Sequence, residues 1–352
     1  MGDTPSVKPE IYRGKSRYKG ERVVGAKRPK TAVAKDETLA PKKSLGQNFL
    51  RDEKVLARIL ESIPSDVKCV LEVGPGEGAL TRELLQAGYS VVAVELDDRA
   101  MVLLRNHFAA EAKLGFTLIH GDILDLSTQK SVQEALVYQC ARIARETKKV
   151  PKKSESAVAS DATATAEVET PLPAASGVSY QVVANIPYYI TAPIIRSLIT
   201  YTPQPASITL MVQDEVAERL TAPVGELSIL GIMAQLYTRA TYLFQVSRRA
   251  FYPIPNVDSA IIQLVPIRAY DHDFDKQFFG MIRGAFAAKR KTLINNLSNM
   301  WHSDRAEATR ILDTLELSPE IRAQEVSVEQ WQQIWQLHTE GKQGRISEPK
   351  EA

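Results

Sequence analysis

The chain has 352 residues and is 44% hydrophobic, which is enough for one α/β domain of ordinary size and a smaller second domain. Its formal net charge is only +2, so a protein that is basic over its whole surface is excluded and any basic surface must be local. Such a region lies near the N-terminus, where twelve lysines and arginines but only four acidic residues fall between Lys8 and Lys43. Because residues 1–41 contain few large apolar groups, we predict that they form a disordered basic arm.

The cysteine and histidine content argues against a metal centre. Cys69 and Cys140 have no further cysteines with which to build a site, and the five histidines show no ligand spacing, so we expect no metal. No apolar run approaches the ~18 residues of a membrane span, and the N-terminus lacks the hydrophobic stretch of a secretory signal. We therefore predict a cytoplasmic protein that does not bind membranes, and we expect it to be a monomer.

The first half of the chain alternates helical patterns with short apolar runs. Apolar residues recur at helical spacing over Val55–Ile63, and Pro64 ends this helix. Next come a strand at Cys69–Val73, a helix through Leu80 and Leu85, a strand at Ser90–Glu95, a helix at Arg99–Phe108, a strand at Phe116–His120 and a helix at roughly Gln129–Arg145. Alternation of this kind predicts an α/β fold with a doubly wound, mainly parallel sheet.

The second half contains an interruption and then a change of pattern. A tract of Ser, Ala, Thr, Glu and Pro at about 148–179 is predicted to be an unstructured insertion. After it we predict strands at Gln181–Ala184 and Ile208–Val212, a helix at Asp214–Leu220, and strands at Tyr242–Val246 and Ala260–Val265 that close the sheet antiparallel at one edge. From 269 to 340 the pattern is helical and predicts a second, small domain, followed by a disordered tail at 341–352.

Three features follow predicted strands, at the edge where open α/β sheets bind ligands. The turn that begins at Gly74 has the spacing G-x-G-x-G and would let the backbone approach a ligand closely, although a simple tight turn fits the same residues. Glu95 ends the second strand, where a carboxylate would accept hydrogen bonds from ribose hydroxyls, or would be merely solvated. Asp122 could accept from an adenine amine, or could be an ordinary turn aspartate.

The element Asn185-Ile186-Pro187-Tyr188 lies where the strand at Gln181–Ala184 ends. The N6 amine of adenine is a poor nucleophile, because its lone pair is delocalised into the ring. An Asn185 side-chain oxygen and a backbone carbonyl at Ile186 or Pro187 could accept from its two N–H groups and favour a pyramidal amine in the transition state, while Tyr188 stacks on the base. A proline-terminated strand with core tyrosines is the alternative interpretation.

Taken together, these motifs resemble the small-subunit (16S) ribosomal RNA adenine N6,N6-dimethyltransferase family, from about Lys42 to Leu297. The matching runs are Lys43–Leu50, Glu72–Gly76, Glu95–Asp97, Gly121-Asp122, Asn185–Tyr188, Gln213–Leu220, Phe251–Ser259, and Ala285-Phe286 with Lys289–Leu293. The resemblance implies a seven-stranded Rossmann-like methyltransferase domain at 42–268 with a C-terminal helical domain that contacts RNA. It also implies S-adenosylmethionine as the cofactor.

The resemblance also assigns roles to residues. Asn48 and Leu50 would bind the cofactor beside Gly74, Glu95, Asp122 and Asn185, and Phe251 would form the second face of an adenine clamp opposite Tyr188. The implied reaction is dimethylation of adjacent adenosines near the 3′ end of small-subunit rRNA in a pre-30S particle, as part of ribosome biogenesis. Tyr189, which follows the Asn-Ile-Pro-Tyr element, leaves open how much room a dimethylated product has.

Several alternatives share parts of this pattern. Enzymes that methylate adenine N6 in large-subunit rRNA share the Asn-x-Pro-Tyr element, but the runs at Phe251–Ser259 and at Ala285-Phe286 with Lys289–Leu293 favour the small-subunit group. DNA adenine methyltransferases use a similar tetrapeptide, but nothing in this sequence resembles a domain that reads a DNA sequence. A ribosome-assembly factor that dispenses with catalysis is a third possibility. The basic residues Lys289, Arg290 and Lys291 lie in a helical pattern of the second domain, where they would contact RNA phosphates or form a solvated helix face.

Overall fold

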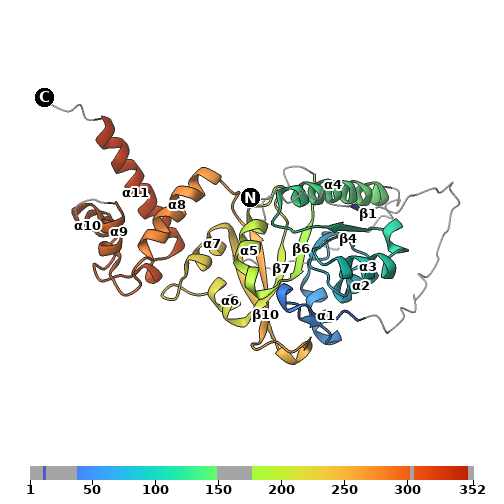
Figure 1. Ribbon diagram of the computed structural model, residues 1–352. Coiled ribbons are helices and arrows are strands. Elements are labelled where there is room, and N and C mark those ends of the chain that lie inside the picture. Colours follow the sequence, from blue (N-terminus) through green and yellow to red (C-terminus); the bar gives the residue numbers. More distant parts are fainter. Residues whose placement is uncertain (1–10, 13–37, 149–176, 302–304, 348–352) are drawn as a thin grey trace, which may run out of the picture. The chain divides into compact units, whose positions relative to one another are not determined.

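The computed structural model describes residues 11–12, 38–148, 177–301 and 305–347 (Figure 1). Most of the predicted basic arm and of the predicted insertion lies outside these residues. The chain divides into two compact units, the first made of Met1–Asp214 with Leu243–Ile267 and the second of Glu215–Tyr242 with Arg268–Ala352. Within the described ranges, no helix combines the length and the apolar character that crossing a membrane requires.

The first unit is built on one mixed sheet, whose strands lie in the order β1-β5-β4-β3-β6-β7-β10-β8. Their bounds are β1 (Ile11–Tyr12), β3 (Cys69–Val73), β4 (Ser90–Glu95), β5 (Phe116–His120), β6 (Gln181–Asn185), β7 (Ile208–Gln213), β8 (Thr238–Val246) and β10 (Ser259–Pro266). Strands β5, β4, β3, β6 and β7 run parallel, and β10 pairs antiparallel with β7. The seven predicted strands and the antiparallel edge are therefore confirmed, and the two-residue β1 adds an eighth strand beside β5.

Helices cover both faces of this sheet, with α4 on one side and α2 and α3 on the other (Figure 1). The helices of this unit are α1 (Glu53–Ser62), α2 (Ala79–Gln86), α3 (Asp98–His107), α4 (Leu126–Lys148) and α5 (Thr191–Ile199). Every residue of β3 and β4 is buried, as expected of central strands covered on both faces. Two-residue strands β2 (Phe49–Leu50) and β9 (Phe251–Tyr252) form a separate antiparallel pair.

The glycine turn between β3 and α2 has a conformation that side chains disfavour. Gly74, Gly76 and Gly78 have φ angles of 70°, 56° and 80°, in the left-handed region. A Cβ on Gly78 would lie 2.6 Å from the Phe108 ring, so this residue also lets α2 pack closely against the end of α3. These glycines are therefore needed for the turn itself and for the helix packing that follows it.

The second unit is helical, as predicted. It contains α6 (Asp214–Leu220), α7 (Ile229–Tyr237), α8 (His272–Ala285), α9 (Leu293–Trp301), α10 (Arg305–Thr314) and α11 (Val328–Ser347). Its two segments are Glu215–Tyr242, which includes the first residues of β8, and Arg268–Ala352. Hydrogen bonds from the backbone N–H groups of Gly225 and Leu227 to the carbonyl of Gln324 join the first segment to the C-terminal helices.

Some described residues differ from the boundaries predicted for disordered segments. Ile11–Tyr12 pairs antiparallel with β5, within the region predicted to be an arm without structure. Helix α4 continues to Lys148 and α11 to Ser347, beyond their predicted ends. Just after the predicted insertion, Tyr180 is fully buried and its hydroxyl donates to the carbonyl of Pro203 at 2.7 Å.

Candidate active site

A cavity opens at the carboxyl ends of the parallel strands β3, β4, β5 and β6. The glycine turn, the ends of β4 and β6, the residues after β5, and residues 45–50 line it. The strand register explains why these segments meet, because Val73 pairs with Val94 on one side and with Ala184 on the other, and Glu95 pairs with His120. The predicted residues Asn48, Leu50, Gly74, Glu95, Asp122, Asn185, Pro187 and Tyr188 all line this cavity.

Glu95 connects the glycine turn to the residues that follow β4. Its side chain is only 7% exposed and accepts three backbone N–H groups, from Gly76 at 3.0 Å and from Leu96 and Asp97 at 2.9 Å each. Burial raises the pKa of Glu95, and these hydrogen bonds oppose the rise because they favour the carboxylate. The residue therefore has two possible roles, accepting from a ligand and fixing the glycine turn next to which that ligand would lie.

Two of the predicted cofactor ligands reach the cavity from its rim. Asp122 is exposed, and its Oδ1 accepts from the backbone N–H of Leu124 at 2.9 Å, as in an aspartate turn. Leu50 lies in β2 and is buried, with its backbone paired to that of Phe251. Asp122 therefore presents polar groups and Leu50 an apolar wall.

Hydrogen bonds hold the side chains of Asn185 and Tyr188 in place at the cavity. The Asn185 amide nitrogen donates to the carbonyl oxygen of Asn48 at 3.3 Å, which leaves its Oδ1 as the acceptor of the side chain. The Tyr188 hydroxyl lies 2.7 Å from Oγ of the buried Ser259, and this contact fixes the ring. Pro187 caps the short helix η3 (Tyr188–Ile190) that carries the tyrosine. The element thus places an acceptor and an aromatic ring side by side.

For Phe251, the predicted clamp opposite Tyr188 stays a prediction. Its side chain is 4% exposed, packs in the core of the first unit, and is absent from the residues that line the cavity in the described part of the chain. Tyr189, by contrast, is 60% exposed and lines the cavity, with its ring 3.1 Å from where a Cβ on Gly46 would lie. Because the Tyr189 ring is exposed, it restricts the space at the edge of the cavity less firmly than a buried ring would.

Sequence reasoning gave no role to Glu72, which also lines the cavity. Its side chain is 2% exposed, and Oε2 accepts from the Thr81 hydroxyl at 2.6 Å. Burial raises the pKa of Glu72 to about 8, with the bond from Thr81 acting in the opposite direction and the charge of Glu95 adding to the rise. Its position inside an apolar strand, two residues before Gly74, was the available signal.

The structure changes the setting of Lys289, Arg290 and Lys291. They lie in the turn between α8 and α9, not in a helix, and all three side chains are exposed.

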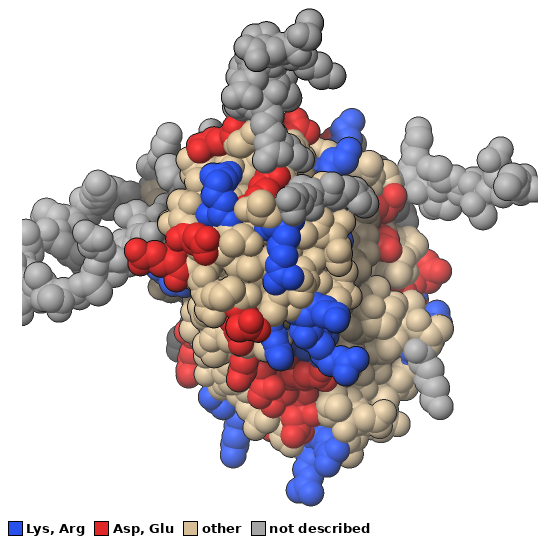
Figure 2. Space-filling view, turned by 90° about the vertical axis from the view of Figure 1, so that its left-hand side faces the viewer, with Lys and Arg blue, Asp and Glu red and all other residues tan. Residues whose placement is uncertain are grey.

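On the face shown in Figure 2, lysine and arginine side chains lie among aspartate and glutamate side chains, so basic groups form local clusters there and not a continuous basic surface. This pattern agrees with the small net charge.

Comparison with known proteins places this geometry in a family. The family model for ribosomal RNA adenine dimethylase matches residues 39–340. Ribosomal RNA small subunit methyltransferase A of Dehalococcoides mccartyi is 32% identical over 308 residues, covering 86% of this chain and 90% of that protein. The protein of the same name from Bacillus mycoides is 34% identical over 302 residues, covering 82% and 88%.

Two solved structures are also similar to this chain. The 23S rRNA methyltransferase ErmE is 25% identical with a TM-score of 0.54, covering 82% of this chain and 99% of that one. A dimethyladenosine transferase from Plasmodium falciparum has a TM-score of 0.58 at 24% identity, covering 83% and 98%, and shows likeness of fold. Because the family model spans nearly all of the described chain, this protein belongs to the ribosomal RNA adenine dimethylase family.

Proposed function

We propose that this enzyme transfers methyl groups from S-adenosylmethionine to N6 of two adjacent adenosines near the 3′ end of small-subunit rRNA, twice on each, during ribosome biogenesis. The observation that carries the proposal is the convergence of Asn185 and Tyr188 with Glu95 and the glycine turn in one cavity. An amine-positioning element and a nucleoside-binding edge are the two parts that such a transfer requires.

The residues present suit S-adenosylmethionine. Glu95 offers a carboxylate to the ribose hydroxyls, the glycine turn allows close approach of the carboxylate end of the methionine moiety, and Asp122 offers an acceptor to the adenine amine. The bound cofactor supplies a methyl group on a positively charged sulfur, which is reactive without further activation. The protein therefore contributes binding, orientation and exclusion of water.

The reaction itself depends on the target amine. The lone pair of N6 would accept the methyl group that the bound cofactor supplies, leaving the neutral thioether, and N6 would then release one proton to solvent. Asn185 Oδ1 and a backbone carbonyl at Ile186 or Pro187 accept from the amine, and so stabilise its pyramidal form more than its planar one. Tyr188, held by Ser259, gives the base a surface on which to stack.

The target adenosine must leave its stack to enter this cavity, which costs a few kcal/mol. We propose that phosphate contacts from Lys289, Arg290 and Lys291 and from the basic arm at 1–41 offset that cost. The arm lies almost wholly outside the described residues, and the three basic residues are exposed. The supporting observation is charge, and such contacts carry no sequence information.

Mass spectrometry of rRNA from cells that lack the protein tests the proposal. The expected result is loss of N6,N6-dimethyladenosine from the 3′ end of small-subunit rRNA, restored by the wild-type gene. Loss from large-subunit rRNA instead would support the reaction that ErmE's name states. An assembly factor that dispenses with catalysis would be indicated if an Asn185→Ala gene restored growth fully without restoring the methyl groups.

A further inference from the structure

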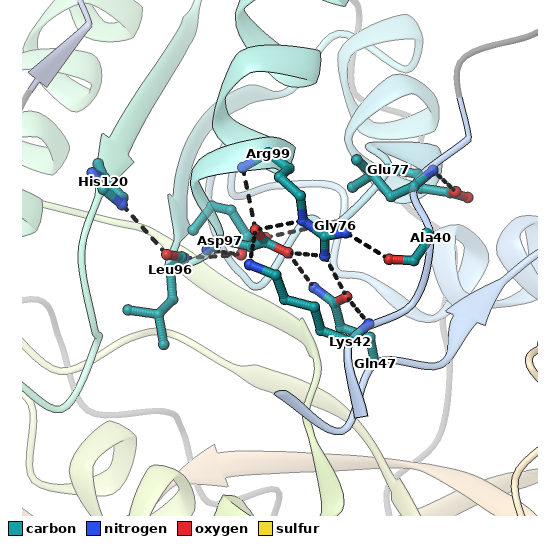
Figure 3. Close-up of polar contacts among 11 residues, drawn as sticks. Ala40, Lys42, Gln47, Gly76, Glu77, Leu96, Asp97, Arg99 and His120 are labelled. Atoms are coloured by element: carbon teal, nitrogen blue, oxygen red, sulfur yellow. Dashed lines mark hydrogen bonds and ion pairs between the residues drawn. The ribbon is translucent and has the colours of Figure 1, made fainter. Parts of the chain in front are cut away.

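Asp97 is the most heavily bonded carboxylate at the cavity edge. It follows Glu95 by two residues, caps the N-terminus of α3, and has a side chain that is 0% exposed. Figure 3 shows three side chains converging on it. Arg99 donates from Nε at 3.1 Å and Nη2 at 2.6 Å, Gln47 donates from Nε2 at 2.9 Å, and Lys42 donates from Nζ at 3.2 Å.

Two of these partners come from the 39–50 segment, which precedes α1. Arg99 adds two more contacts to that segment, from Nη1 to the carbonyl of Ala40 at 2.7 Å and from Nη2 to Oε1 of Gln47 at 3.3 Å. Gln47 Oε1 also accepts the backbone N–H of Lys42 at 2.9 Å. Asp97 and Arg99 together therefore hold the segment at three of its residues, Ala40, Lys42 and Gln47.

The charge on Asp97 makes its contact with the 39–50 segment costly to break. Burial by itself raises the pKa of Asp97, but the hydrogen bonds from Arg99, Gln47 and Lys42 outweigh that effect and leave the pKa well below its usual value. Asp97 therefore stays ionised, and an ionised buried carboxylate is costly unless its donors remain in place. Releasing the segment would remove Lys42 and Gln47 and leave Asp97 with Arg99 alone.

The same segment forms part of the cavity. Residues 45–50 line it, and the carbonyl of Asn48 receives the amide of Asn185 at 3.3 Å. The Phe49 ring lies 3.1 Å from where a Cβ on Gly76 would be, so the segment packs directly over the glycine turn. Whatever fixes residues 39–50 also fixes one wall of the cavity and the orientation of Asn185.

We propose that Asp97 is a positioning residue which, with Arg99, anchors the 39–50 segment as a wall of the cofactor cavity and so governs how long the cofactor stays bound. The identity of that cofactor rests on the proposed function. Asp97 is not among the described residues that line the cavity, and both of its carboxylate oxygens accept from Arg99 and from the 39–50 segment. It acts through Gln47 and Lys42.

The test uses the full chain and the variant Asp97→Asn, which keeps the size of the side chain and an oxygen for capping α3. Amide hydrogen exchange without cofactor should accelerate about tenfold or more across residues 39–50 while α3 stays protected. The dissociation rate of S-adenosylmethionine should rise by a similar factor, and the Michaelis constant for the cofactor should rise more than the turnover number falls. The control is Asp271→Asn, because Asp271 caps α8 in the same way by accepting from Asp273 and Phe274.

A second variant, Gln47→Ala, removes the link from the segment side and leaves the cap of α3 untouched. It should give the same pattern, and the double variant should be less than additive, because both changes weaken the same set of contacts between Asp97 and the segment. Unchanged exchange at 39–50 in both variants would overturn the proposal, as would equal acceleration in α3. If the wild-type chain failed to bind S-adenosylmethionine while the exchange pattern held, the proposed function would fail and the anchoring role would stand.

Discussion

The cavity edge and the turn between α8 and α9 differ in how their charged side chains are exposed to solvent. At the cavity edge the carboxylates of Glu72, Glu95 and Asp97 are buried, and each is held by hydrogen bonds. In the turn, Lys289–Lys291 are all exposed. A buried charge with fixed partners is costly to disturb, whereas an exposed charge is screened by salt and replaceable. Changes at the cavity edge should therefore be large and specific to one step, and changes in the turn should be small, graded and dependent on salt.

The largest effect is expected from Asn185→Ala. Its oxygen is the acceptor assigned to the reacting amine, and removal of one such group lowers rates by about 10²–10³. Cofactor affinity should change little, because on the cofactor side the variant removes only the hydrogen bond to the Asn48 carbonyl. Single-turnover methylation and a separate binding titration measure the two effects. A variant with near-normal turnover would contradict the mechanism.

Glu95→Ala should act on binding more than on the chemical step. The variant removes the carboxylate that accepts from the ribose hydroxyls, a loss of charge-assisted hydrogen bonding worth about 1.5–3 kcal/mol. It also leaves the N–H groups of Gly76, Leu96 and Asp97 without their acceptor. Isothermal titration should show S-adenosylmethionine bound about ten- to a hundredfold more weakly. Unchanged affinity with an unchanged melting temperature would remove Glu95 from the site.

The raised pKa of Glu72 predicts how stability depends on pH. The folded protein keeps this proton up to a pKa of about 8, whereas the unfolded chain releases it near the ordinary value of 4.5. The free energy of unfolding should therefore fall as pH rises through that window, by about 2 kcal/mol from Glu72 between roughly pH 5 and 7.

Glu72→Gln cannot titrate and serves to isolate this effect. Chemical denaturation of the variant and of the wild type should show their stability difference shifting in favour of the variant as pH rises toward 8, and then staying constant. Parallel pH profiles for the two proteins would show that Glu72 is ionised in the folded state at neutral pH.

The smallest effect is expected from neutralising the basic turn. Replacing Lys289, Arg290 or Lys291 with glutamine should reduce the log–log salt slope of RNA binding by roughly 0.7–0.9 for each phosphate that is no longer neutralised. The drop in affinity should be greatest at low salt, with cofactor binding unaffected. If the slope stayed the same, the turn would make no phosphate contact and the docking surface would lie elsewhere.

The sequence was most informative about the cavity edge, because the rules that apply there are geometric. Parallel strands end at one edge, so residues that follow them in the sequence, such as Gly74, Glu95 and Asn185, had to converge. The spacing of the glycines predicted a tight turn that a ligand could approach closely, and the left-handed conformations of these residues in the structure fit such a turn. The mainly parallel sheet followed from the alternation of elements, and its antiparallel edge was predicted from the last two strands, but the order of the strands was not predicted.

Long-range side-chain contacts could not be predicted in the same way. The apolar character of Phe251 is equally suited to a clamp or to a core, and its burial fits either, so the clamp stays a prediction. Asp97 gains two of its three partners, Lys42 and Gln47, from residues about 50 positions away in the sequence, so no local pattern revealed their contact. The residues at 215–242 read as part of the first domain because they follow its strands, but their packing partners come from the C-terminal helices.

Reconstitution with purified components would decide whether this chain methylates small-subunit rRNA through Asn185. Purified protein would be incubated with S-adenosylmethionine and small-subunit particles from cells that lack the enzyme, with large-subunit particles in a parallel reaction, and the rRNA would be analysed by mass spectrometry. We expect four methyl groups on two adjacent adenosines near the 3′ end of the small-subunit rRNA, and transfer lowered about a hundredfold or more with the Asn185→Ala protein at the same reaction time. Methyl transfer to the large-subunit rRNA alone, or equal transfer by wild type and variant, would contradict the proposed function.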